Sequence, residues 1–140
     1  MSDVPSASDI EARLRQASSL PEALDVSFDA FEAIRMPARD CQDRVPELFA
    51  AFMMTADAAV EGREALTPAP SLPLTSGAQP GNAGAVRADA NQVADTLAAL
   101  AAVLRDRLTD AAARADTPDD RAACQDAAEA AGRICQLMTR

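Results

Sequence analysis

Three carboxylates near the middle of the chain have the spacing that a metal site on one helix would need. Asp57, Glu61 and Glu64 follow one another at intervals of four and three residues, which places them on one face of a helix. Carboxylate oxygens are the ligands that Mg²⁺ prefers, so this pattern indicates a candidate metal site and an alternative function as a Mg²⁺-dependent all-α hydrolase. We favour the simpler interpretation, an acidic edge in contact with water, and expect no bound cofactor.

Other side chains that could perform catalysis are scarce. The sequence contains no His and no Lys, so Ser–His, Cys–His and Ser–Lys pairs cannot be assembled. Cys41, Cys124 and Cys135 lack CxxC spacing, and we expect reduced thiols that pack as small hydrophobic side chains. The absence of His and Lys and the spacing of the cysteines favour a non-catalytic protein over an enzyme.

The second candidate site is apolar. Residues 45–60 read VPELFAAFMMTADAAV, and between residues 48 and 60 only Thr55 and Asp57 are polar. A helix that is apolar on all sides must be covered by neighbouring helices around most of its circumference. Surplus apolar surface would form a partner-binding seam edged with acids, for which the candidate residues are Leu48, Phe49, Phe52, Met53 and Met54. Two alternatives stay open, an ordinary core built from these side chains and a small-molecule pocket between this helix and the next.

The charge of the chain limits the kind of partner. The formal net charge is -9, the pI is about 4.4, and every cationic side chain is an Arg. Binding to nucleic acid or to an anionic membrane needs a cationic surface, so we expect neither as a partner. No stretch approaches the roughly 20 apolar residues that cross a membrane, and the N-terminal segment lacks a signal-peptide pattern, so we expect a cytoplasmic protein. The expected partner is another protein or a second copy, giving a homo-oligomer.

Periodicity and composition predict an all-α fold, a four-helix bundle formed by residues 1–140 as a single domain. We expect helices at about 9–35, 44–66, 86–115 and 118–138, the first of them bent near Ser19, where a second helix-start signal occurs. Residues 67–85 contain four Pro and three Gly and are expected to form a long linker between the second and third helices. Because a linker does not pack, we expect that deleting residues 71–84 leaves the helices folded.

The segment around Pro37 allows two interpretations. The apolar periodicity continues through Ala38 and Cys41, as in one kinked helix over residues 20–66. Each interior proline would cost such a helix about 3 kcal/mol. We favour a break, in which the first helix ends at Arg35, a turn covers residues 37–42, and the second helix starts with Asp43 as its N-cap.

The third and fourth helices have regular apolar stripes, which predict their inward faces. The predicted inward residues are Val93, Leu97, Leu100, Leu104, Leu108 and Ala111 in the third helix, and Cys124, Ala127, Ala131, Ile134 and Met138 in the fourth.

Overall fold

The computed structural model describes residues 7–73 and 89–139, and every regular element in these ranges is helical. The elements are α1 (Ala7–Gln16), α2 (Leu20–Cys41), the 3₁₀ helix η1 (Pro46–Leu48), α3 (Phe49–Leu66), α4 (Ala90–Arg114) and α5 (Pro118–Met138). The all-α prediction is confirmed. The predicted count of four helices is wrong, because the described residues form five α-helices. None of these helices is both long and apolar enough to span a membrane.

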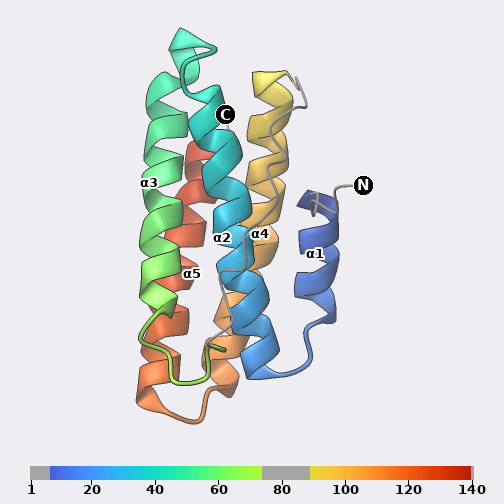
Figure 1. The fold of residues 1–140 in the computed structure, drawn as a ribbon, viewed down its shortest axis with the longest axis vertical. Helices are drawn as coiled ribbons and strands as arrows, with labels where there is room; N and C mark the ends of the chain where they lie inside the picture. The colour runs from blue at the N-terminus through green and yellow to red at the C-terminus, as the bar shows by residue number, and fades with distance from the viewer. Residues whose placement is uncertain (1–6, 74–88, 140) are drawn as a thin grey trace.

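Helices α2 to α5 lie side by side, and α1 lies against their outer surface (Figure 1). Both α2 and α5 pack against α3 and α4, which places α3 diagonally across the bundle from α4. In the view of Figure 1, α3 and α4 run downward, whereas α2 and α5 run upward. Since α3 and α4 are parallel, the chain between them must connect opposite ends of the bundle.

The predicted helix over residues 9–35 is divided into α1 and α2 at Ser19. The Ser19 hydroxyl accepts a hydrogen bond from the amide N–H of Glu22, as an N-cap does at a helix start. The Glu22 carboxylate in turn accepts from the amide of Ser18. These bonds satisfy N–H groups that a new helix leaves free, so the chain forms a second helix rather than a bend.

The break between α2 and α3 is confirmed, but it lies further along the chain than predicted. Helix α2 continues through Pro37 to Cys41, and burial of Ala38 and Cys41 in the core offsets the hydrogen bond that the proline removes. Val45 is extended, as expected for a residue before a proline, which prevents a helix start at residue 44. The N-cap position of α3 is therefore Leu48, and the prediction of Asp43 was wrong.

The core lies between α2, α3, α4 and α5, and alanines contribute much of it. Its two buried aromatic side chains are Phe31 of α2 and Phe52 of α3. A Cβ atom at Gly62 of α3 would overlap the ring of Phe31, so this glycine permits the close approach of α2 and α3. The predicted inward faces of the last two helices are confirmed except at Val93, which is half-buried.

The predicted linker lies only partly within the described residues, since residues 74–85 fall outside them. Residues 67–73 pack on the bundle, because Ala69 is buried and Ser71 bonds to α5. The Ser71 amide and hydroxyl donate to the Asp120 carboxylate at 3.1 and 2.7 Å. Helix α4 begins at Ala90, and residues 86–88 of the predicted third helix also lie outside the described residues.

Candidate functional site

Among the described residues, the large apolar side chains exposed to solvent both belong to the first part of α3. Phe49 is 40% exposed and Met54 is 51% exposed. Ala50 is exposed as well, and Met53 is half-buried. Residues four apart on a helix lie one above the other, so Phe49–Met53 and Ala50–Met54 form two adjacent ridges. We name these four residues the apolar face of α3.

The position of α3 in the bundle explains why this face is uncovered. Helix α3 packs chiefly against two neighbours, α2 and α5 (Figure 1). Their contacts bury Phe52, Thr55, Ala56 and Ala59, which lie on the side of α3 turned toward the bundle. Because two neighbours cover only part of a helix, the expectation that α3 is covered around most of its circumference does not hold for its first turns.

The residues of the predicted seam divide between the core and the surface of the protein. Phe52 has no exposed surface and belongs to the core, so it must be removed from the partner-binding set. Leu48 is half-buried and packs against the core. Phe49, Met53 and Met54 remain as candidate contacts, because Phe49 and Met54 are exposed and Met53 is half-buried.

The three candidate metal ligands lie further along the same side of α3. Asp57, Glu61 and Glu64 are all exposed. Asp57 forms an ion pair with Arg39 of α2 at 3.8 Å, and Glu61 pairs with Arg133 of α5. Within residues 7–73 and 89–139, no group of three or more His, Cys, Asp or Glu side chains could hold a metal ion. The carboxylates share a helix side, as predicted, but the structure does not gather them around a common point.

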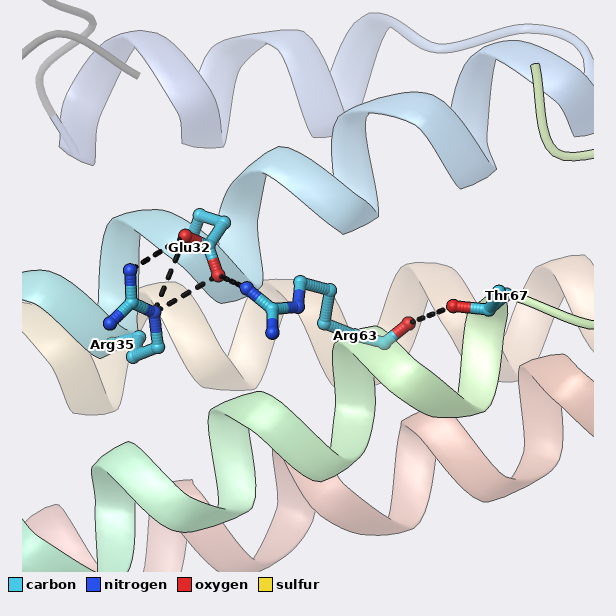
Figure 2. A network of polar contacts seen from close by, with 4 residues as sticks. All are labelled: Glu32, Arg35, Arg63 and Thr67. Atoms are coloured by element: carbon cyan, nitrogen blue, oxygen red, sulfur yellow. Dashed lines mark hydrogen bonds and ion pairs between the residues drawn. The ribbon is translucent and has the colours of Figure 1, made fainter. Parts of the chain in front are cut away.

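A partly buried ion network, which was not predicted from the sequence, connects α2 to α3. Glu32 is 8% exposed, and its carboxylate accepts hydrogen bonds from Arg35 in the same helix and from Arg63 of α3 (Figure 2). Burial opposes ionisation of Glu32, but the bonds and charges of the two arginines outweigh it and lower the pKa of the carboxyl group. The signal in the sequence was the Glu32–Arg35 spacing of three residues.

This network holds helices together and offers no reactive group. Both guanidinium groups are directed at the same carboxylate in Figure 2, and the carbonyl oxygen of Arg63 accepts from the Thr67 hydroxyl at 3.3 Å. The sequence places Glu32 three residues after Asp29, on a side of the helix that carries acids. Arg63 reaches this position from α3, a contact between residues 31 positions apart in the sequence.

The cysteines are free thiols, and two of them are buried. Burial raises the pKa of the Cys124 thiol to about 11, and the charge of Asp120 acts in the same direction. Burial likewise raises the pKa of Cys41. A thiol of raised pKa is protonated at neutral pH and is a poor nucleophile. Cys41 and Cys124 thus pack as small hydrophobic side chains, as predicted, whereas Cys135 is half-buried.

Comparison with known proteins assigns no family to this arrangement. No family model, no curated protein and no solved structure matches the chain. The function must therefore be inferred from the geometry of the described residues. Among them, the exposed large apolar side chains are Phe49 and Met54, both on the apolar face of α3.

Proposed function

We propose that this chain is a non-catalytic protein-interaction module that binds a protein through the apolar face of α3. One observation carries the proposal, the exposure of Phe49 and Met54 on a helix whose other side is firmly packed. Aromatic and Met side chains are enriched at protein interfaces, and Met adapts its shape to different partners.

A helix side of this kind suits a partner that is itself helical. Phe49–Met53 and Ala50–Met54 are neighbouring ridges of α3, and the second ridge is lower at the small side chain of Ala50. Ridges of one helix pack into grooves of another at such surfaces.

The three free cysteines support a reducing location for this function. Disulfides are rare where glutathione and thioredoxin keep thiols reduced, and buried free thiols are common there. We therefore propose that the module acts in the cytoplasm.

The test compares two double variants in affinity capture from a native extract. Phe49→Ser with Met54→Ser removes the apolar face, while Ala99→Ser with Ala122→Ser alters exposed positions on α4 and α5 as a matched control. All these sites are exposed, so the variants should melt within a few degrees of the parent protein.

The proposal expects a protein that the parent and the control retain and that the Phe49→Ser/Met54→Ser variant loses. It would be overturned by a chain that remains monomeric and captures nothing, or by capture that the loss of the apolar face does not change. Light scattering after size exclusion gives the oligomeric state of each variant.

A further inference from the structure

We infer that the occupant of the apolar face is a basic amphipathic helix of a partner protein, lying along α3. This inference rests on the proposed function and adds the chemistry of the partner. The observation that carries it is a change from apolar to acidic side chains along one ridge of α3. Phe49, Met53, Asp57 and Glu61 follow at intervals of four residues, so the first half of the ridge is apolar and the second half is acidic.

The dimensions of this ridge suit a helix laid along it. From Phe49 to Glu61 the helix rises about 18 Å, or roughly three turns. A partner helix of similar length would place apolar side chains on Phe49 and Met53. Its next turns would place their side chains beside Asp57 and Glu61, and only basic side chains complement both carboxylates there.

The acidic half is accessible to such a partner. The side chains of Asp57 and Glu61 are 62% and 63% exposed, although each forms an ion pair within the protein. Exposed ion pairs contribute little free energy, so Arg39 and Arg133 can give way to cations of the partner. Glu64 lies one turn beyond Glu61 on the same side and is also exposed.

The net charge argues against a second copy as the occupant. Each chain has a formal charge of -9, so two copies brought together repel each other. The negative charge of the chain attracts a basic helix and repels a second copy.

The experiment selects binders from a displayed library of helical peptides against the full-length chain. Each peptide has a fixed apolar stripe of two turns, followed by two turns whose polar positions are equal mixtures of Lys/Arg, Gln and Glu. The parent protein should enrich peptides with basic residues in the later turns. Binding of enriched peptides should weaken with added salt, because the charges are exposed.

Variants then test which carboxylates are used. Asp57→Asn and Glu61→Gln should each lower the affinity of an enriched peptide about two- to fivefold, in line with exposed ion pairs. The matched control, Asp126→Asn with Glu129→Gln on exposed positions of α5, makes the same change in net charge as the double variant on α3. It should leave the affinity unchanged, because those carboxylates lie on another helix.

Four results would overturn the inference, and they separate it from the proposed function. Enrichment of Gln or Glu peptides that still require Phe49 and Met54 refutes the basic partner but supports the interaction module. A dimer that dissociates in the Phe49→Ser/Met54→Ser variant identifies a second copy as the occupant. Peptides that bind this variant as tightly as the parent, or no enrichment at all, refute both the partner and the binding surface.

Discussion

The Glu32 carboxylate stabilises the fold because it is ionised between two arginines inside the protein. Its pKa is lowered from the ordinary value of 4.5, so the ion contributes stability above that pH. The contribution disappears as the pH falls through the lower pKa of the folded state. Arg35 and Arg63 both pair with this carboxylate (Figure 2), so its replacement removes the anion that the two guanidinium groups share.

We expect Glu32→Gln to lower the free energy of unfolding by about 1–3 kcal/mol at pH 7, the range for hydrogen bonds to charged groups. Glu64 is exposed, so the free energy of unfolding of Glu64→Gln, measured in urea, should differ from that of the parent by less than about 0.5 kcal/mol. The difference in the free energy of unfolding between Glu32→Gln and the parent should become smaller below pH 4.5, because the Glu32 carboxyl of the folded parent takes up its proton in that acid range. If the difference in the free energy of unfolding stays constant down to pH 2, the charge of Glu32 does not cause the loss of stability in the variant.

Two helical glycines provide a second comparison of single residues. A Cβ at Gly62 would overlap the buried Phe31 ring, whereas one at Gly132 would meet the Cδ atom of Arg105 at an ordinary 3.7 Å. We expect Gly62→Ala to destabilise the protein by about 1–3 kcal/mol through overpacking. Gly132→Ala should stabilise it by about 0.5–1 kcal/mol through helix propensity. Thermal unfolding of both variants tests this, and equal melting temperatures would contradict the close approach at Gly62.

At the scale of the element, α3 combines one side that builds the core with another that faces solvent. Phe52 is fully buried and Phe49 is 40% exposed, although they lie one turn apart in the same helix. We expect Phe52→Ala to cost about 3–5 kcal/mol, the usual range for a buried aromatic side chain. Phe49→Ala should cost less than about 1 kcal/mol. Urea unfolding measures the free energy of unfolding of each variant. Similar decreases for Phe49→Ala and Phe52→Ala would mean that Phe49 packs in the core.

At the scale of the whole molecule, the parallel arrangement of α3 and α4 sets a minimum length for their connection. The end of α3 at Leu66 and the start of α4 at Ala90 lie at opposite ends of the bundle, so they are separated by the rise of α3, about 26 Å, together with the width of the bundle. Deletion of residues 71–84 leaves nine residues, which span at most about 32 Å when fully extended. The deletion also removes the hydrogen bonds between Ser71 and Asp120.

This topology reverses the expectation that the deletion is tolerated. We expect the variant lacking residues 71–84 to melt at a lower temperature and less cooperatively than the parent, as measured by circular dichroism. A variant lacking only residues 77–80 retains enough chain to reach Ala90 and should melt like the parent. Cooperative melting at the parent's temperature in both variants would refute the parallel arrangement of α3 and α4.

Local chemistry in the sequence determined the all-α class, the start of the last helix at Pro118 and the inward stripes of α4 and α5. Capping residues and apolar spacing act within a few residues of themselves, so they can be read without knowing the fold. The Thr117 hydroxyl does accept from the Asp120 amide, as an N-cap should. A break within residues 20–66 was also predicted, but the chain breaks before Pro46, whereas Pro37 lies inside α2.

Tertiary structure alone decided which sides of these helices are covered. Phe49, Phe52 and Met54 have similar hydrophobicity, and only the positions of α2 and α5 bury the second and expose the others. The approach of Arg63 to Glu32 and of Ser71 to Asp120 likewise joins residues distant in the sequence. Periodicity fixes the direction of each side chain around its own helix, but burial depends on neighbours that local spacing does not specify.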